Sequence, residues 1–247
     1  MPQDSNPVTL HFSLIVPIHD EEENVDRLLD ELAAVLAAHG PMEVIAVDDG
    51  SVDRSLARMR EWKQQHGADW LRIVQLVANV GQSAAVMAGA EIARAPIIAT
   101  IDGDLQNDPA DLPAMVARVE SGEVDGVFGV RRSRQDTWVR RVSSRIGNVV
   151  RNWITGDSVR DAACGIKVVR REFFLGVPRF VGMHRFMATL VRYLGGRVVE
   201  MDVNHRERYA GTAKYGIGNR MFRGLRDCFS VRWLRSRLLR HRVEHEY

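Results

Sequence analysis

The stretches FSLIVPI at residues 12–18 and MEVIAVDD at 42–49, with the segment 22–39 between them, decide the fold class. The two quoted runs are apolar and of strand length, whereas the segment between them has the length and amphipathic pattern of a helix. The alternation continues with helices expected at 51–66, 80–94 and 109–121 and strands expected at 71–77, 96–102 and 124–130. This pattern predicts βαβ units, and therefore an α/β fold with a mostly parallel sheet and helices on both faces.

The chain beyond residue 130 is less regular. We expect strands at 162–169 and 197–205, and a helix at 183–196 that ends at glycine. A final helical segment places apolar side chains near one face among many arginines: Met221, Phe222, Leu225, Phe229 and Leu234. It predicts either a helix packed on the domain or a basic amphipathic helix lying on an anionic bilayer.

The 247 residues fit one large α/β domain, or a domain with a substantial extension. The formal net charge of +2 hides an asymmetry. Residues 1–130 hold 8 Lys and Arg against 22 Asp and Glu, a net −14, and residues 131–247 hold 26 against 10, a net +16. An acidic half joined to a basic half suits a protein that binds phosphates, nucleic acid or a membrane surface.

The cysteines, the histidines and the N-terminus exclude several classes. Cys164 and Cys228 form no disulfide framework, which favours a reducing compartment, and both are predicted to be packing residues. The eight histidines show no zinc-binding spacing, and His184 and His205 are expected to be structural rather than catalytic. The N-terminal segment lacks the basic region of a signal peptide, and no run approaches the roughly 18 apolar residues of a membrane span. We therefore expect a cytoplasmic protein, which can still lie on a membrane surface.

Acidic loops follow three of the expected strands: PIHDEEEN the first, DDGSVD the second and DGDLQND the fourth. In open α/β sheets, ligands bind beyond the carboxyl ends of the strands. Asp102 and Asp104 repel each other unless a cation or solvent screens them, so the fourth loop is either a metal site or a solvated turn. Convergence of the three loops favours a metal site, in which Mg²⁺ or Mn²⁺ would bind the diphosphate of a nucleotide sugar.

Eight short motifs occur in order along the chain: VPIHDEEEN, VDDGSVD, ANVGQSAAVMAG, DGDLQNDP, GVRRSRQD, RRVSSRIGN, DAACGIKVVRRE and NHRERYAGTAKYG. Together they resemble glycosyltransferase family 2, and within it the polyprenyl-phosphate glycosyltransferases of the dolichol-phosphate mannosyltransferase type. The resemblance covers nearly the whole chain, from Leu14 to about Trp233. It implies a GT-A fold with a Rossmann-like sheet, and inversion of configuration at the transferred sugar.

The resemblance also implies roles for individual residues. The nucleotide-sugar positions are Pro17, His19, Glu21, Asp48, Asp49, Asp102, Gly103 and Lys214. The metal and diphosphate positions are Asp102, Asp104 and Gln106, and the acceptor-phosphate positions are Arg131, Arg140 and Ser144. The candidate catalytic residues are Asp104, Arg131 and Arg208, and the loop with Arg208 and Lys214 is expected to close over the phosphates. Arginine suits phosphate because its planar fork donates paired hydrogen bonds.

A phosphate acceptor changes the chemistry that the site must supply. A phosphate monoester has a second pKa of about 6 and is largely dianionic at neutral pH, whereas a hydroxyl acceptor needs a general base. No acidic residue occurs between Gly182 and Leu190, where many relatives that act on hydroxyls have one, so we expect direct attack by a phosphate oxygen. The chain departs from the family pattern at His19-Asp20, where Tyr-Asn is usual, and at Ala78, where Arg is usual.

The leading interpretation is a metal-dependent hexosyltransferase that moves a sugar from a GDP- or UDP-sugar to dolichyl or undecaprenyl phosphate. We expect a catalytic domain at 1–216, with a nucleotide-sugar half at 1–130 and an acceptor half at 131–216. A basic amphipathic segment at 217–247 would associate with the cytoplasmic face of a membrane, where a separate membrane subunit could be a partner. The alternatives are a family 2 enzyme acting on a hydroxyl, a basic nucleic-acid-binding protein, an aspartate-nucleophile phosphatase and a noncatalytic scaffold. Few aromatic side chains accompany the basic residues, which disfavours nucleic acid as a partner.

Overall fold

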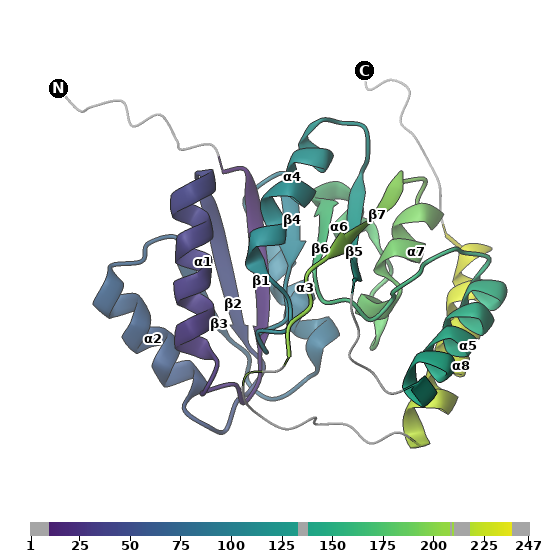
Figure 1. The fold of residues 1–247 in the computed structure, drawn as a ribbon, viewed down its shortest axis with the longest axis horizontal. Coiled ribbons are helices and arrows are strands. Elements are labelled where there is room, and N and C mark those ends of the chain that lie inside the picture. Colours follow the sequence, from purple (N-terminus) through teal and green to yellow (C-terminus); the bar gives the residue numbers. More distant parts are fainter. Residues whose placement is uncertain (1–9, 133–137, 208, 210–217, 239–247) are drawn as a thin grey trace.

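The structure is a computed structural model that describes residues 10–132, 138–207, 209 and 218–238. In the two helices that begin at residues 138 and 218, side chains are described only from Gly147 and Gly224 onward. The strands are β1 (Phe12–Ile18), β2 (Met42–Asp48), β3 (Leu71–Gln75), β4 (Ile97–Thr100), β5 (Gly126–Arg131), β6 (Lys167–Arg170) and β7 (Val198–Val203). They form one sheet, which runs through the centre of the molecule (Figure 1).

Helices connect the strands. The α-helices are α1 (Val25–His39), α2 (Ser55–His66), α3 (Gln82–Ile92), α4 (Leu112–Glu120), α5 (Trp138–Thr155), α6 (Arg171–Gly176), α7 (Met187–Tyr193) and α8 (Gly218–Arg235). Two short 3₁₀ helices, η1 (Pro109–Asp111) and η2 (Met183–Arg185), precede α4 and α7. The helix predicted at 183–196 is thus divided into η2 and α7, and the strand predicted at 162–169 begins only at Lys167.

The sheet is mixed and mostly parallel, as predicted. Its strand order is β3-β2-β1-β4-β6-β5-β7. Strands β1 to β4 run parallel to one another and β7 runs parallel to β5, whereas β6 is antiparallel to both of its neighbours. The two halves expected at 1–130 and 131–216 therefore contribute strands to the same sheet, and the division of the chain at residue 216 stays a prediction.

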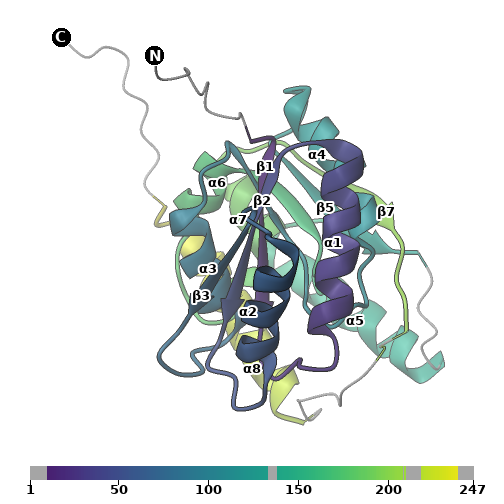
Figure 2. The same cartoon turned by 90° about the vertical axis from the view of Figure 1, so that its left-hand side faces the viewer.

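Alternate residues of the central strands face two opposite helical layers. Leu14 and Val16 of β1 belong to the apolar cluster formed with α1, α2 and α4, whereas Ile15 belongs to the cluster formed with α3, α6 and α7. Figure 2 shows α1 and α2 on one side of the sheet and α3 on the other. Because both faces are covered, every residue of β2 is buried, which explains its continuous apolar run.

The C-terminal helix α8 packs on the domain, although the apolar face predicted for it is only partly correct. Cys228 and Val231 are buried in the cluster shared with α3, and Leu225 packs against it. Phe229, which was predicted on the same face as Leu225, is 59% exposed, because the inward positions follow the spacing 225, 228 and 231. Met221 and Phe222 lie outside the residues whose side chains are described. In the described part of the chain, no helix combines the length and the apolar character needed to cross a bilayer.

Candidate active site

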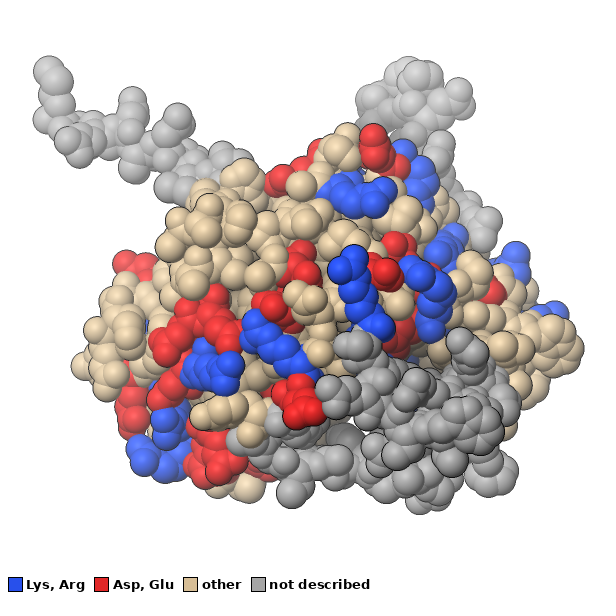
Figure 3. All heavy atoms as spheres, in the orientation of Figure 1, with Lys and Arg blue, Asp and Glu red and all other residues tan. Residues whose placement is uncertain are grey.

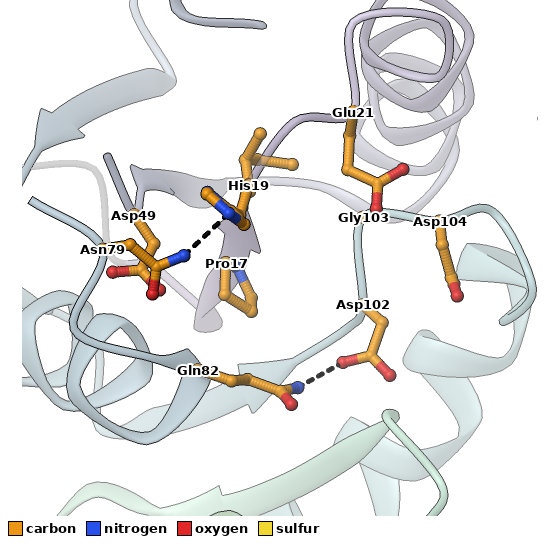
Figure 4. A pocket seen from close by; sticks show the side chains of 10 residues that line it. Pro17, His19, Glu21, Asp49, Asn79, Gln82, Asp102, Gly103 and Asp104 are labelled. Atoms are coloured by element: carbon orange, nitrogen blue, oxygen red, sulfur yellow. Dashed lines mark hydrogen bonds between the residues drawn. The ribbon is translucent and has the colours of Figure 1, made fainter. Parts of the chain in front are cut away.

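The acidic loops predicted to converge do meet at one edge of the sheet. Strands β2, β1 and β4 are neighbours and parallel, so their carboxyl ends lie together. An open pocket of about 200 Å³ lies there, and Figure 4 shows the side chains that line it. The lining residues are Pro17, Ile18, His19, Glu21, Asp49, Asn79, Gln82, Asp102, Gly103 and Asp104. Six of the eight predicted nucleotide-sugar residues are among them, together with Asp104; the other two are Asp48 and Lys214.

Asp49 holds the wall of this pocket in place. Its two carboxylate oxygens accept hydrogen bonds from the backbone amides of Val80 and Gly81, at 2.8 and 2.9 Å. Gly50 supports the same loop, since a Cβ on it would lie 2.4 Å from the backbone nitrogen of Asn79, and its φ of +66° favours glycine. Asn79 in turn donates to Nε2 of His19 at 2.7 Å. The carboxylate of Asp49 therefore shapes the pocket, in addition to lining it.

Asp48 is buried at the end of β2, with 1% of its surface exposed. Within the described part of the chain, neither of its carboxylate oxygens has a hydrogen-bond partner. A buried polar atom without a partner costs about 1–3 kcal/mol and calls for an explanation. Asp48 does not line the pocket but directly precedes Asp49, which does, so an N–H group of a ligand that reached past Asp49 would supply the missing donor, as the predicted contact with a nucleoside requires.

Asp102 is held on both sides of its carboxylate. Gln82, at the start of α3, donates from Nε2 to Oδ1 at 2.7 Å (Figure 4). On the other side, a Cβ added to Gly165 would lie 2.2 Å from Oδ2. Burial raises the pKa of Asp102, the nearby charge of Lys167 opposes the rise, and the charge of Asp104 adds to it.

The turn after Asp102 presents Asp104 to the pocket. Leu105 has a φ of +60°, which is unusual for a residue with a side chain, and it is buried at 2% exposure. The backbone amide of Gln106 donates to Oδ1 of Asp104 at 3.3 Å, which orients that carboxylate. Gln106, predicted as a third metal ligand, does not line the pocket.

The carboxylates of Asp102 and Asp104 fit a hard divalent cation. In the described part of the chain, no three His, Cys, Asp or Glu side chains come together as a metal site. Mg²⁺ is commonly bound by only one or two carboxylates, with substrate phosphates completing its coordination. The donor set in this pocket therefore suits a cation that arrives with a diphosphate.

Of the residues predicted to bind the acceptor phosphate, Arg131 is the one that the structure describes fully. It ends β5 and forms a bidentate ion pair with Asp161, at 2.7 and 2.8 Å. The positive charge of Arg131 also lowers the pKa of Asp102, so the two side chains are close enough to interact electrostatically. Arg140 and Ser144 lie in α5, where their side chains are outside the described residues, and Arg208 and Lys214 lie outside the described residues altogether.

The segment that leads to Arg208 is fixed beside the acidic turn. The guanidinium of Arg206 contacts Glu31 and Asp108, each at 2.7 Å. Its backbone amide donates to the carbonyl oxygen of Gln106 at 2.8 Å, and His205 forms a β-bridge with Asn107. The chain therefore enters its predicted phosphate loop next to Asp104.

Many arginines of the basic half are neutralised by ion pairs. Arg160 pairs with Glu200, Arg170 and Arg197 pair with Asp125, Arg185 pairs with Asp227, and Arg192 pairs with Asp157. Acidic and basic side chains are correspondingly interspersed on the face shown in Figure 3. The described surface therefore offers a polyanion less positive charge than the composition alone indicates.

Four residues of the site were not predicted from the sequence: Asn79, Gln82, Lys167 and His184. The first two lie in the motif ANVGQSAAVMAG, and the position of this motif directly after β3 is the signal that could have identified them. Lys167 and His184 line a small pocket that adjoins Asp102. Their distance from Asp102 along the sequence left no pattern from which to infer that contact.

The mixed sheet, with a pocket and an acidic turn at the carboxyl edge of its parallel strands, has the architecture expected of a GT-A fold. The sequence profile described as Glycosyl transferase family 2 matches residues 13–176, and the chain belongs to this family. A solved structure, glucosyl-3-phosphoglycerate synthase from Mycobacterium tuberculosis in complex with Mn²⁺, UDP and phosphoglyceric acid, matches with a TM-score of 0.67 at 17% identity. That match covers 93% of this chain and 78% of the other, and it confirms the predicted GT-A fold.

Curated relatives are polyprenyl-phosphate sugar transferases. The chain is 40% identical, over 92% of its length, to dodecaprenyl-phosphate galacturonate synthase from Rhizobium johnstonii. It is 33% identical, over 85% of its length, to undecaprenyl-phosphate 4-deoxy-4-formamido-L-arabinose transferase from Edwardsiella ictaluri. The chain spans 68% and 64% of the length of these two relatives. The predicted subgroup and the glycosyltransferase class are confirmed, whereas the prediction of a hexose stays open, because the second name contains an arabinose derivative.

Proposed function

We propose that this chain transfers a sugar from a nucleotide sugar to a polyprenyl phosphate and thereby forms a lipid-linked monosaccharide. The observation that carries the proposal is the single pocket that brings Pro17, His19, Glu21, Asp102 and Asp104 together. Pro17 lies near the end of β1, the other four residues come from the loops after β1 and β4, and the family resemblance assigns these positions to the donor and its metal. The names of the two curated relatives support a polyprenyl phosphate as the acceptor.

The donor would lie along the pocket with its nucleoside toward β2. Asp48 supplies two buried carboxylate oxygens for N–H donors of the nucleobase. Asp49 keeps the adjoining wall in position through its bonds to the loop of Val80 and Gly81. The diphosphate would then reach the turn of Asp102 and Asp104, where a sugar can face the neighbouring side chains of Gln82 and Lys167.

Asp102 and Asp104 would hold Mg²⁺ or Mn²⁺ with the diphosphate, and such a cation stabilises the charge that develops on the leaving nucleoside diphosphate. Gln82 and Gly165 keep the carboxylate of Asp102 in one orientation before any ligand binds. Preorganisation of this kind lowers the reorganisation that the reaction requires.

The acceptor would attack as a phosphate dianion, without a protein base. Its oxygen displaces the nucleoside diphosphate from the anomeric carbon in line, so one C–O bond forms as the other breaks and the configuration inverts. The charge of Arg131 lowers the pKa of Asp102, and the ion pair of Arg131 with Asp161 fixes the direction of its guanidinium. We assign Arg131, with Arg140 and Ser144, to the acceptor phosphate, and Arg208 and Lys214 to the donor phosphates.

A membrane surface is the site at which a polyprenyl phosphate would be met. Helices α5 and α8 pack together and each exposes two large apolar side chains four residues apart: Val149 and Trp153 on α5, and Phe229 and Trp233 on α8. Arginines accompany them, and Arg237, two residues after the end of α8, stacks on Trp233 with its guanidinium carbon 5.7 Å from the ring centroid. Aromatic side chains mixed with arginines suit the interface of an anionic bilayer. We propose that this surface holds the enzyme on the cytoplasmic leaflet.

The test is transfer of radiolabelled sugar into the organic-extractable fraction. UDP-galacturonate, UDP-glucose and GDP-mannose are each supplied with undecaprenyl phosphate and Mn²⁺ or Mg²⁺. We expect labelled lipid with one of these donors, none without the lipid phosphate, and loss of transfer in Asp104→Ala. The exposed Asp69→Ala serves as the matched control, and it should transfer at the wild-type rate. Label that enters only water-soluble products would instead indicate a hydroxyl acceptor.

A further inference from the structure

A small second pocket adjoins the donor pocket. It shares Pro17, Gln82 and Asp102 with the donor pocket, and Lys167 and His184 contribute to its remaining wall. Its volume is about 10 Å³, which is room for one water-sized group. A phosphate does not fit such a space, whereas a single hydroxyl does.

The hydrogen bonds around Ser83 fix the tautomer of His184. The backbone amide of Gly182 donates to Oγ of Ser83 at 2.9 Å, and the same Oγ lies 2.7 Å from Nδ1 of His184. Ser83 is buried, and its hydroxyl has one proton to donate. Nδ1 of His184 is the one acceptor within reach of that proton in the described part of the chain. The hydroxyl therefore donates to Nδ1, and the ring carries its own proton on Nε2.

The imidazole of His184 also stays neutral. Burial lowers the pKa of His184 to about 3, and the charges of Lys167 and Arg185 act in the same direction. A neutral ring with its proton on Nε2 can donate one hydrogen bond from that atom. Among the described residues, the one hydrogen-bond partner of His184 is Ser83, so Nε2–H is left for a ligand.

Lys167 presents a second donor to the same small pocket. Lys167 lies on β6, where it is paired with Thr100 of β4, and its side chain lines the small pocket. The residue is 9% exposed. Within the described residues, the ammonium has one long hydrogen bond, 3.5 Å to the carbonyl oxygen of Gly165, and no carboxylate within 4.0 Å. The two donors require an acceptor atom from the ligand, and the carboxylate of Asp102, which lines the same pocket, can accept a hydrogen bond from the ligand. A hydroxyl of the ligand meets both requirements.

We propose that the pocket of His184 and Lys167 binds one hydroxyl group of the transferred sugar, with Nε2–H of His184 as its donor. The proposal rests on the proposed function, because it takes the sugar of a nucleotide sugar as the ligand. It makes His184 a residue that selects donors by the presence of this hydroxyl, and it makes Ser83 a positioning residue that holds the required tautomer. A site built to donate to a substrate hydroxyl discriminates strongly against an analogue that lacks it.

The experiment measures donor binding by calorimetry with Mn²⁺ and without lipid phosphate. UDP-galacturonate and UDP-glucose are each compared with their 2-deoxy, 3-deoxy and 4-deoxy analogues. In the wild type, we expect one analogue of the bound donor to bind about 10- to 100-fold more weakly than the parent. In His184→Met, the parent donor should bind more weakly by a similar factor, whereas the binding of that analogue should not change. The preference for the parent over the analogue should therefore disappear. His184→Gln keeps an amide donor and should restore part of the preference, and the exposed His39→Met is the control that should leave it intact.

Two results would overturn the proposal. One is an unchanged preference between the parent donor and all deoxy analogues in His184→Met, since a purely structural histidine would alter stability without altering selectivity. The other is a proton on Nδ1 of His184 in the wild type, read from the ¹⁵N chemical shifts of the imidazole. Because binding is measured without lipid, a protein that shows the hydroxyl preference but transfers no sugar to undecaprenyl phosphate would contradict the proposed function and support the role of His184.

Discussion

The backbone of Gly165 lies against the carboxylate of Asp102, so closely that a Cβ on Gly165 would come within 2.2 Å of Oδ2. The same Cβ would lie 2.7 Å from Oδ1 of Asn107, another residue of the acidic turn. Gly165 is not at a positive φ, so the backbone itself would accept a side chain. The glycine is thus required by the space that Asp102 occupies.

Gly165→Ala should displace Asp102 and reduce transfer by about 10²-fold, the cost of a misplacement on the order of 1 Å at a reacting centre. Gly147→Ala is the matched control, because a Cβ there meets nothing within 4 Å. Both variants are assayed for sugar transfer and for thermal unfolding. Wild-type activity in Gly165→Ala would show that the position of Asp102 does not matter to turnover.

Arg206→Met should raise KM for the nucleotide sugar by about tenfold or more, because it removes two charge-assisted hydrogen bonds, to Glu31 and Asp108. Those bonds fix the segment that precedes Arg208 beside the acidic turn. The exposed Arg94→Met removes an arginine whose side chain makes no such contact within the described residues, and it should leave KM unchanged. Steady-state kinetics at varied donor concentration measures the effect. An equal change in both variants would mean that net charge, and not the fixed segment, controls donor binding.

Asp157 links folding stability to pH. Burial alone would raise its pKa, but hydrogen bonds from the Thr189 hydroxyl and the Ser158 amide, and the ion pair with Arg192, outweigh burial and lower it. A carboxyl whose pKa is lower in the folded state stabilises the fold above its unfolded pKa, and this stabilisation is lost as the pH falls through the folded value.

Asp157→Asn should therefore lower the free energy of unfolding by about 1–3 kcal/mol at pH 7. The difference from the wild type should shrink as the pH falls below about 4, where the aspartate of the unfolded chain is protonated. Urea unfolding at a series of pH values measures it. A difference that stays constant down to the acid limit would show that packing, and not the charge of Asp157, is responsible.

The fold and most of the donor pocket were predictable because both depend on local pattern. Apolar runs followed by acidic loops locate the ends of β1, β2 and β4, and parallel pairing brings Pro17, Glu21 and Asp102 to one edge. The roles of Ser83 and His184 were not predictable, since they lie 101 residues apart and meet only when η2 packs beside α3. The hydrogen bonds from Val80 and Gly81 to Asp49 were not predictable either, because they depend on the conformation of a loop outside the motif that contains Asp49.

The exposed apolar residues of α5 and α8 supply a last prediction, on attachment to membranes. Trp153 is 80% exposed and Trp233 is 59% exposed, and transfer of such side chains from water to the bilayer interface is favourable. In a sedimentation assay, the double variant Trp153→Ser, Trp233→Ser should bind vesicles of phosphatidylglycerol and phosphatidylethanolamine with an affinity about tenfold or more below that of the wild type.

The double variant Val52→Ser, Val77→Ser is the matched control, since these valines are also exposed but lie in loops near β2 and β3. Donor binding without vesicles should be the same in all three proteins. If the valine variant weakens vesicle binding as much as the tryptophan variant, attachment depends on general surface hydrophobicity and not on the surface of α5 and α8.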